Sequence, residues 1–312
     1  MIVGIDEVGR GPWAGPLVVG AVVLGCEIDG LTDSKKLSKQ KREQLSIEIF
    51  EKAASVGIGW VHASELDEIG LSAALALACR RALEEIDVPY HEIIIDGTVN
   101  FLKDSGKGKY VTTMKKADLL VPAVSAASIV AKVARDEYMR AQDRIYPNYA
   151  FGTHVGYGTA KHREAIQSYG LTPLHRQSFA PIAALSGQVK VIKPLDHKGN
   201  TKAIGNEGEA VAAEYLVSQG FAIIDRNWKT KMCEIDIVAS KEHKLYFVEV
   251  KHRKNAQSGD GISAITSKKR RQMNLAARMY VHWNNLYGTD AVLAAVSTTG
   301  KPPLFERYLE IE

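Results

Sequence analysis

The feature that most constrains this chain is an apolar segment near its start that runs directly into two acidic residues, Gly4-Ile5-Asp6-Glu7-Val8-Gly9-Arg10-Gly11-Pro12. Its apolar residues predict a short buried strand. Because neighbouring strand side chains point to opposite faces, Asp6 and Glu7 share one site only if the strand ends or bulges there. A divalent cation with oxygen ligands is the usual compensation for two buried carboxylates. The alternative is an exposed acidic turn.

A second segment repeats this design, because Glu92-Ile93-Ile94-Ile95-Asp96-Gly97 is again an apolar strand that ends in a carboxylate and a glycine. In open α/β sheets, functional groups gather at the ends of strands. Asp6 and Asp96 are therefore candidates for one site if their strands are neighbours. The alternative for Asp96 is a turn residue before Gly97.

The remaining pattern of the first half alternates strands and helices. We expect strands at 17–24, 56–61 and 109–114 and helices at 38–54, 64–86 and 122–141, with Ser38 as a helix cap. On the last helix, Ser125, Ser128 and Lys132 are spaced three and four apart and share one face, which is either the solvated side or part of a site. Lys35 and Lys36 precede the Ser38 cap and are either solvated or phosphate-binding.

The length of 312 residues and a hydrophobic content of 46% predict two domains. Residues 186–200 have no clear period and contain Gly, Pro and Lys, so we place a linker there, between domains at 1–185 and 201–312. In the second domain we expect helices at 201–219 and 267–283 and strands at 221–226, 233–239, 244–250, 290–296 and 304–310. Acidic residues again lie on its strands, and Glu249 and Lys251 face the same side.

Composition sets limits on location and partners. The net charge of +4 is compatible with an anionic partner without requiring one. Three widely separated cysteines indicate neither a disulfide framework nor a thiolate zinc site, which fits a reducing cytoplasm. The apolar segment at 11–25 is too short and too rich in Pro and Gly to cross a bilayer, so we expect a cytoplasmic protein without a membrane partner. The sequence does not reveal which protein partners the chain has.

Five motifs in the first 185 residues resemble ribonuclease HII, the type 2 ribonuclease H of bacteria. They are Gly-Ile-Asp-Glu-Val-Gly-Arg-Gly-Pro, Asp-Ser-Lys-Lys-Leu-Ser, Ile-Asp-Gly, Ser-Ala-Ala-Ser-Ile-Val-Ala-Lys-Val-Ala-Arg-Asp and His-Arg-Gln-Ser-Phe. The resemblance implies an α/β fold of the ribonuclease H type, a mixed sheet with flanking helices. It also implies a catalytic site of four metal-binding carboxylates: Asp6, Glu7, Asp96 and Asp118.

The family uses Mg²⁺ or Mn²⁺ to cut the RNA strand of RNA–DNA hybrids, and it cuts duplex DNA 5′ of single embedded ribonucleotides, leaving 3′-hydroxyl and 5′-phosphate ends. By resemblance, Gly9, Arg10 and Gly11 contact the 2′-hydroxyl and Tyr157 stacks on the next deoxyribose. The resemblance assigns phosphate contacts to Lys35, Lys36, Ser125, Ser128 and Lys132. The chain departs from the family where Ala117 replaces a usual Gly, which would restrict the loop that carries Asp118, and where Val155 replaces a usual Lys.

Residues 204–296 resemble the YraN family, which has a smaller α/β fold of the restriction-endonuclease type and no settled activity. The residues that carry the resemblance are Gly205-Asn206-Glu207-Gly208-Glu209, Glu234-Ile235-Asp236 and Phe247-Val248-Glu249-Val250-Lys251. In that nuclease fold Glu209, Asp236 and Glu249 would bind a metal ion and Lys251 would polarise the attacking water. We interpret Cys233 as a small strand residue. The basic run at 268–271 suits either a phosphate backbone or a solvated helix end.

The sequence therefore predicts a metal-dependent ribonuclease HII followed by a DNA nuclease domain. One alternative is a second domain that binds nucleic acid without cutting it. Another is an ATPase of the actin or sugar-kinase type, whose fold shares the ribonuclease H core. Such ATPases need a duplicated core, whereas residues 201–312 do not repeat residues 1–185.

Overall fold

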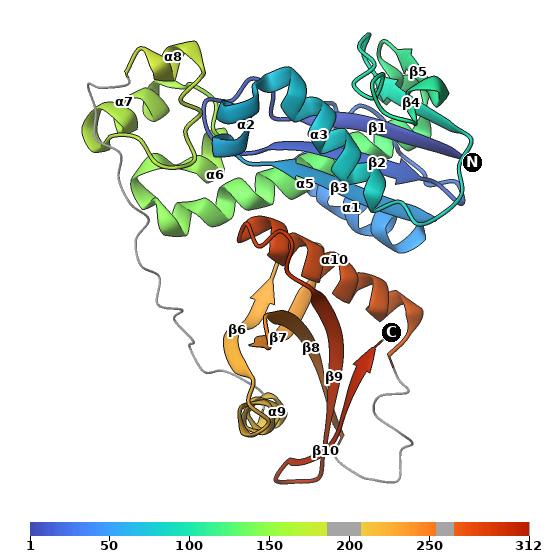
Figure 1. Cartoon of the computed structure of the whole chain (residues 1–312), viewed down its shortest axis with the longest axis vertical. Coiled ribbons are helices and arrows are strands. Elements are labelled where there is room, and N and C mark those ends of the chain that lie inside the picture. The colour runs from blue at the N-terminus through green and yellow to red at the C-terminus, as the bar shows by residue number, and fades with distance from the viewer. Residues whose placement is uncertain (186–206, 254–264, 312) are drawn as a thin grey trace. The chain divides into compact units, whose positions relative to one another are not determined.

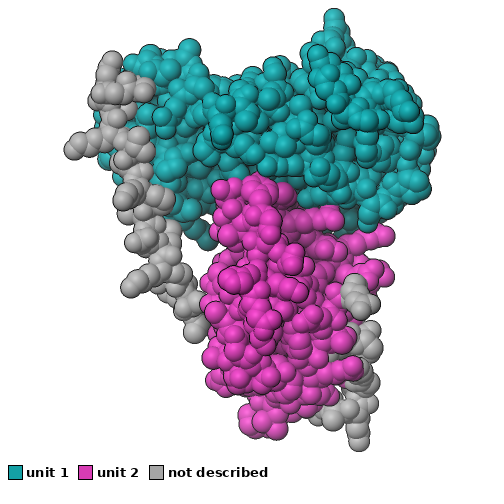
Figure 2. Space-filling model, viewed as in Figure 1, with its two compact units in different colours: residues 1–196 teal, residues 197–312 magenta. Residues whose placement is uncertain are grey.

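The computed structural model describes residues 1–185, 207–253 and 265–311. The chain forms two compact units, residues 1–196 and 197–312, drawn in different colours in Figure 2. The predicted linker at 186–200 and the first residues of the predicted second domain lie outside the described residues.

The first unit is built on a mixed five-stranded sheet with the order β3-β2-β1-β4-β5 (Figure 1). The two antiparallel pairs are β1 with β2 and β2 with β3, whereas β4 runs parallel to both β1 and β5. The strands are β1 (Ile2–Val8), β2 (Leu17–Val23), β3 (Ser55–Val61), β4 (Glu92–Asp96) and β5 (Val111–Met114). All five lie close to their predicted positions, and the mixed sheet confirms the predicted fold class.

Helices lie in the connections from β2 to β3 and from β3 to β4, and further helices follow β5. They are α1 (Lys39–Lys52), α2 (Ala63–Ile69), α3 (Leu71–Glu84), α4 (Ala117–Leu120), α5 (Pro122–Ile145), α6 (Phe151–His154), α7 (Ala160–Tyr169) and α8 (Ala180–Ala183), with 3-10 turns η1 (Gly108–Tyr110) and η2 (Pro147–Tyr149). Ser38 caps α1 as predicted, because its hydroxyl accepts a hydrogen bond of 3.2 Å from the Lys41 N–H. Helix α5 ends at Ile145, one turn beyond its predicted end.

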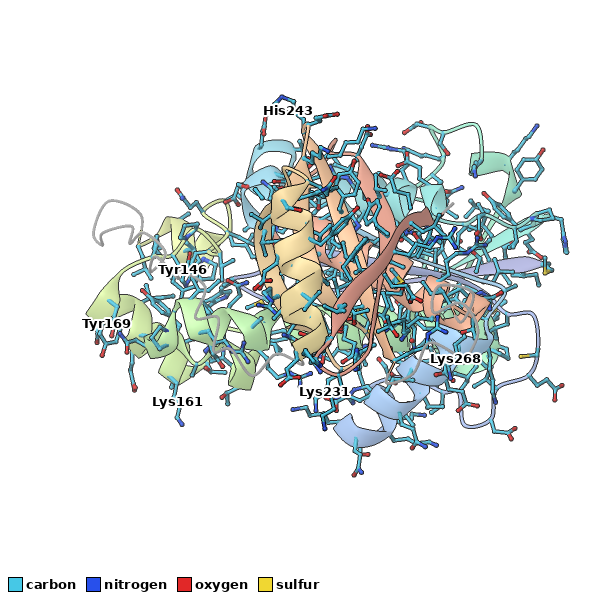
Figure 3. All side chains as sticks on the ribbon, turned by 90° about the horizontal axis from the view of Figure 1, so that it is seen from below. Tyr146, Lys161, Tyr169, Lys231, His243 and Lys268 are labelled. Carbon is cyan, nitrogen blue, oxygen red and sulfur yellow. The ribbon has the colours of Figure 1, made fainter. Side chains whose placement is uncertain are left out.

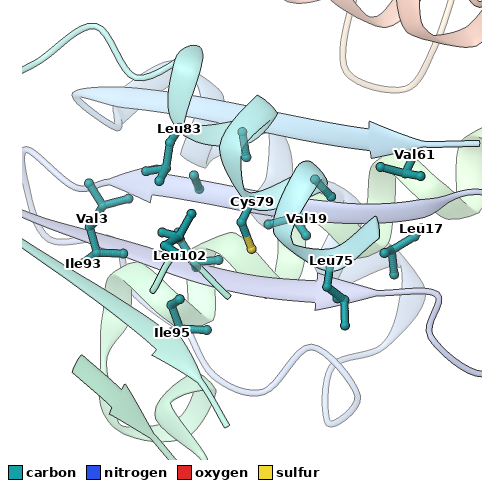
Figure 4. Close-up of a cluster of buried hydrophobic side chains, with 14 of the residues drawn as sticks. Val3, Leu17, Val19, Val61, Leu75, Cys79, Leu83, Ile93, Ile95 and Leu102 are labelled. Atoms are coloured by element: carbon teal, nitrogen blue, oxygen red, sulfur yellow. The ribbon is translucent and has the colours of Figure 1, made fainter. Parts of the chain in front are cut away.

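The two faces of this sheet are packed differently. On one face, side chains of α3 such as Leu75, Cys79 and Leu83 pack against residues of β1, β2 and β4 (Figure 4). Side chains alternate along β1, so Gly4 faces the opposite side, where α5 approaches closely. A Cβ atom at Gly4 would lie 2.2 Å from the Ala123 carbonyl carbon. Glycine in the strand therefore sets the distance between α5 and the sheet.

The second unit contains another five-stranded sheet, with the order β10-β9-β8-β7-β6, in which only β8 and β9 are parallel. Its strands are β6 (Ala222–Lys229), β7 (Glu234–Lys241), β8 (Lys244–Arg253), β9 (Ala291–Thr299) and β10 (Leu304–Ile311). Its helices are α9 (Glu207–Ser218) and α10 (Ser267–Trp283), and α10 has its predicted bounds. In the described part of the chain, no helix is both long and apolar enough to span a membrane.

Candidate functional site

Asp6 and Glu7 lie within β1 and not at its end. The strand continues to Val8 and pairs with β2 without a register shift, with Asp6 opposite Gly20 and Glu7 opposite Val19. The condition for Asp6 and Glu7 to share one site, that the strand ends or bulges there, is therefore not met along β2. The pairing of β1 with β4, however, ends at Ile5, so the sheet opens on that side where the acids begin.

Asp96 lies directly beside this opening. Ile5 pairs with Ile95 in the parallel register, so Asp6 and Asp96 are the next residues of two neighbouring strands. This confirms the condition under which they were predicted to share a site. Asp96 Oδ1 accepts a hydrogen bond of 2.8 Å from the Ala117 N–H, which holds the start of α4 and hence Asp118 near the end of β4.

The four acids influence one another electrostatically. Burial, with added repulsion from Glu7 and Asp96, raises the pKa of Asp6 to about 7. The pKa of Glu7 is raised by burial and by Asp96, although Arg10 Nη1, 3.1 Å from Glu7 Oε1, opposes the shift. Burial and the charges of Asp96 and Asp33 also raise the pKa of Asp118. Negative charge is thus concentrated at one edge of the sheet.

This set of donors suits a hard divalent cation. The described residues contain no three His, Cys, Asp or Glu side chains already gathered around one position that could hold a metal ion. Mg²⁺ is usually held by one or two carboxylates together with waters and substrate phosphates, so such a site does not need a preformed cage of three side chains. Carboxylates that carry mutual repulsion gain stability when a cation enters. The residues therefore fit Mg²⁺ or Mn²⁺.

Ser125 and Ser128, on α5, are buried and support the acids. The Ser128 hydroxyl bonds the Asp6 carboxylate and lies 2.9 Å from the Ser34 hydroxyl. Ser125 Oγ donates to the Asp118 carbonyl oxygen over 2.6 Å. The alternative that this part of the helix face is solvated is wrong, because the two serines are 2% and 7% exposed.

The predicted lysine contacts lie around these serines. Lys35 and Lys36 follow the buried Ser34 and are exposed. Lys132, one turn after Ser128, forms an ion pair of 2.7 Å with Asp136. Of the three, Lys35 acts on an acid of the site, because its charge opposes the rise in the pKa of Asp118. Their phosphate contacts remain a prediction.

The loop after β1 carries the predicted 2′-hydroxyl contacts. Gly9 has a positive φ of 97°, a conformation that glycine adopts without strain. A Cβ atom at Gly11 would lie 3.6 Å from a ring carbon of Tyr157, so the two predicted sugar contacts are adjacent. The side chains of Tyr157 and Arg10 are about half exposed, at 48% and 55%, and can be reached by a ligand.

The two departures from the family pattern have different structural consequences. Ala117 is buried and packs with Ile94 and Val124, and the left-handed residue is the preceding Lys116, with φ of 59°. Alanine therefore introduces no backbone strain at its own position. Val155, in contrast, is itself left-handed, with φ of 45°, which is strained for a β-branched residue.

A buried histidine cluster, which sequence reasoning missed, lies beside Tyr157. His162 Nδ1 donates to the Tyr157 carbonyl oxygen over 2.9 Å, which leaves His162 Nε2 as the acceptor from His175 Nε2 at 3.0 Å. His175 Nδ1 in turn accepts from the Thr172 N–H over 2.8 Å. Burial lowers the pKa of His162 to about 4 and that of His175 to about 3, so both rings are neutral.

Aromatic rings surround this cluster. Phe151 stacks on Tyr149 with ring centroids 5.2 Å apart, and Tyr149 also contacts Tyr146 and Tyr169, both labelled in Figure 3. The Tyr149 hydroxyl donates to the Gly170 carbonyl oxygen over 2.7 Å. The spacing of His162 and His175 along the chain carries no signal of this network, because several of their partners are backbone groups.

In the second unit, the three predicted acids are coupled electrostatically. Asp236 on β7 has its pKa raised to about 6 by burial and by Glu249, with a smaller contribution from Glu209. Glu249 on β8 is buried, and its carboxylate binds Lys251 Nζ at 2.7 Å. Sequence reasoning did not single out Lys269 of α10, whose Nζ lies 2.8 Å from the other Glu249 oxygen. Of the basic run, Lys268 is exposed (Figure 3).

Comparison with known proteins gives a matching family model for each of the two units. The family model described as Ribonuclease HII matches residues 3–182, and that of the uncharacterised protein family UPF0102, the YraN family, matches residues 208–296. Ribonuclease HII of Dichelobacter nodosus is 46% identical over 188 residues, covering 59% of this chain and 97% of that protein. The enzyme of Halorhodospira halophila is 44% identical over 188 residues, covering 60% of this chain and 95% of that protein.

A solved structure extends the comparison to the fold. The crystal structure of ribonuclease H2 from Pyrococcus horikoshii OT3 superposes with a TM-score of 0.52 at 28% identity, over 60% of this chain and 97% of that one. The family model, these relatives and the mixed sheet with acids at its open edge lead to one conclusion. The chain belongs to the ribonuclease HII family and is a ribonuclease H.

Proposed function

We propose that the first unit hydrolyses the RNA strand of RNA–DNA hybrids and cuts duplex DNA 5′ of embedded ribonucleotides, leaving 3′-hydroxyl and 5′-phosphate ends. The observation that carries this proposal is the position of Asp6 and Asp96 at the open edge between two neighbouring parallel strands. Glu7 and Asp118 are each coupled electrostatically to Asp96. Acids arranged in this way suit phosphodiester hydrolysis assisted by metal ions.

In this proposal Asp6, Glu7, Asp96 and Asp118 hold Mg²⁺ or Mn²⁺. Bound there, the ions would supply Lewis-acid stabilisation for in-line displacement at phosphorus. The chain's own residues position the reactants: Ser128 fixes the Asp6 carboxylate through its hydrogen bond. Lys35, Lys36 and Lys132 bind phosphates, which places the nucleic acid without reading its bases.

Selection of ribose falls to the backbone of Gly9, Arg10 and Gly11. The 2′-hydroxyl is the group that distinguishes RNA from DNA at a given position, and glycines allow a sugar to approach main-chain groups closely. Tyr157 beside Gly11 presents an exposed ring against which the following deoxyribose packs. The site thereby reads the junction between a ribonucleotide and a deoxyribonucleotide.

The test compares wild type with Asp6→Asn on a DNA duplex that contains one ribonucleotide, with Mg²⁺ or Mn²⁺. We expect wild type to cut 5′ of the ribonucleotide and Asp6→Asn to lose at least about a hundredfold in rate. Asp87→Asn serves as control, because Asp87 binds Ser55 at the start of β3, away from the open edge. Equal rates for wild type and Asp6→Asn would rule out the proposed site.

We also propose that the second unit is a metal-dependent DNA nuclease. Support comes from the coupling of Asp236 with Glu249 and Glu209, and from the contact of Lys251 with Glu249. Glu209, Asp236 and Glu249 would hold the cation, and Lys251 would orient the attacking water. The alternative is a module that binds nucleic acid without cutting it.

An experiment in the Asp6→Asn background separates these alternatives, because the first unit is then silent. Full-length Asp6→Asn protein is assayed on plain duplex DNA with Mn²⁺, with and without Asp236→Asn. Asp225→Asn is the matched control, since Asp225 is a partly buried acid on the adjacent strand β6. Cleavage abolished only by Asp236→Asn supports the nuclease, whereas DNA binding without cleavage by the Asp6→Asn protein supports the binding module.

A further inference from the structure

Two buried arginines of the first unit bind main-chain carbonyl groups. Arg135, on α5, donates from Nε to the Pro16 oxygen over 2.8 Å, and its two other nitrogens donate to the oxygens of Ala14 and Val155 over 3.1 and 2.9 Å. Arg176 donates from Nε and Nη2 to the Gly15 oxygen over 3.0 and 2.8 Å, and from Nη1 to the Arg10 oxygen over 3.3 Å. Both side chains are 0% exposed.

No ion pair in the described residues balances either guanidinium, although the charge of Asp136 acts on Arg135 and that of Asp67 acts on Arg176. In residues 1–185, 207–253 and 265–311, no carboxylate lies within ion-pair distance of Arg135 or Arg176. Arg176 instead also lies over the Phe179 ring, with 5.0 Å to its centroid. A buried charge is costly unless its donors are satisfied, so these carbonyl bonds compensate the burial. Burying the charged side chains of Arg135 and Arg176 costs free energy. That both are nevertheless buried indicates that the chain requires the bound carbonyl groups at fixed positions.

All of these carbonyls except that of Val155 belong to the segment that follows β1. Arg10 is the middle residue of the predicted 2′-hydroxyl contact, and residues 14–16 complete the same loop. The Arg135 side chain also fills the space beside Gly9, where a Cβ atom would lie 2.6 Å from Arg135 Nε. Because Gly9 has no side chain, the Arg135 guanidinium can lie against the Gly9 backbone.

Arg135 also joins this loop to the one that carries Tyr157. The Val155 carbonyl that it binds belongs to a strained left-handed residue, which needs surrounding contacts to persist. The N–H groups of Trp13 and Ala14 donate to the Gly156 carbonyl over 2.8 and 3.3 Å. The two loops thus form one hydrogen-bonded unit through Arg135 and Gly156, and Tyr157 follows directly.

We propose that Arg135 and Arg176 are positioning residues that hold the Gly9–Gly11 backbone and Tyr157 in the arrangement that selects ribose over deoxyribose. The proposal rests on the proposed function of the first unit. Neither arginine touches the reacting atoms. Each arginine instead holds main-chain carbonyl groups in place. The fixed carbonyl groups in turn determine where the N–H groups of the Gly9–Gly11 backbone meet the sugar.

The test uses the full chain with Arg176→Lys and, separately, Arg135→Lys, which keep the positive charge and lose the forked donor geometry. The control is Arg81→Lys, because Arg81 also binds a main-chain carbonyl, that of Trp60, and pairs with Glu65, and neither partner belongs to the two loops. Cleavage of a duplex with one ribonucleotide is measured with Mg²⁺, together with the ratio of dissociation constants for that duplex and its all-DNA counterpart in EDTA. Each variant is assayed well below its melting temperature.

We expect a loss in kcat/KM of between about tenfold and about a hundredfold for the loop variants, because small displacements of reacting groups are that costly. The ribose preference in binding should shrink by about tenfold. Arg81→Lys should lower the melting temperature and leave both quantities unchanged. If Arg135→Lys does not fold, Arg176→Lys decides the question alone.

Two outcomes overturn the inference in different ways. Loop variants that melt at lower temperatures but keep the ribose preference and kcat/KM would show a merely structural role and leave the proposed function intact. Wild-type protein that does not cut the ribonucleotide-containing duplex would refute the proposed function, and the positioning role would fall with it.

Discussion

The substitution Gly20→Ala tests whether the close approach of α5 to the sheet positions the acids. Gly20 lies opposite Asp6 in the β1–β2 pairing. A Cβ atom at Gly20 would lie 2.4 Å from the Ala127 carbonyl oxygen, which falls 1.0 Å short of the 3.4 Å at which ordinary contact begins. The helix must therefore retreat by about 1 Å at the residue next to Ser128.

Two effects follow from this displacement. Overpacking costs about 1–3 kcal/mol of the free energy of unfolding. The retreat also carries the Ser128 hydroxyl away from Asp6, and a misplacement of about 1 Å near reacting groups lowers the rate by about a hundredfold. Urea denaturation measures the first effect, and kcat/KM on the ribonucleotide-containing duplex measures the second.

Gly106→Ala is the control, because a Cβ atom there would meet nothing within 4 Å. Its free energy of unfolding should stay within about 0.5 kcal/mol of that of wild type. The reasoning would be refuted if Gly20→Ala matched this control in stability and retained wild-type kcat/KM.

Three further predictions concern pH, strain and metal binding. In an Asp6→Asn background, acidification from pH 7 to pH 5 should lower the free energy of unfolding, because burial lowers the folded pKa of His162 to about 4 and that of His175 to about 3, and only the unfolded chain takes up these protons in that window. Each ring contributes about 2 kcal/mol, partly offset by Glu7 and Asp118, whose raised pKa values act in the opposite direction. Denaturation midpoints that stay constant or rise would contradict this. The Asp6→Asn background is needed because the pKa of Asp6, raised to about 7, stabilises the fold as pH falls. Val155→Gly should raise the free energy of unfolding by up to about 1 kcal/mol by relieving the left-handed strain, and a lowered melting temperature would count against it. Calorimetric Mg²⁺ affinity should fall by about tenfold from pH 8 to pH 6, because the Asp6 proton must leave before the cation binds, and an affinity independent of pH would argue against Asp6 as a ligand.

The order of the elements and the position of the acids were predictable from the sequence. Apolar runs of strand length located β1 and β4, and a capping serine located the start of α1. Parallel pairing of β1 with β4 brings Asp6 and Asp96 together through backbone geometry alone. Apolar runs, helix caps and the pairing of neighbouring strands can be predicted from one sequence.

The course of β1 and the supports of the site were not predictable. The strand runs on through Asp6 and Glu7 because its pairing with β2 continues while that with β4 stops, and no local pattern records this difference. Arg135 and Arg176 bind carbonyls more than 100 residues away in several cases, as with Pro16 and Gly15, and any residue type supplies a carbonyl. The carbonyl partners of these two arginines therefore cannot be predicted from the residue types in the sequence.

Cleavage of a DNA duplex that contains one ribonucleotide, with the new ends identified, tests the central claim most directly. With Mg²⁺ or Mn²⁺, wild type should produce a 3′-hydroxyl end and a 5′-phosphate on the ribonucleotide, and Asp6→Asn should leave the duplex intact. An intact duplex with wild type, or equal cutting by wild type and Asp6→Asn, would contradict the account.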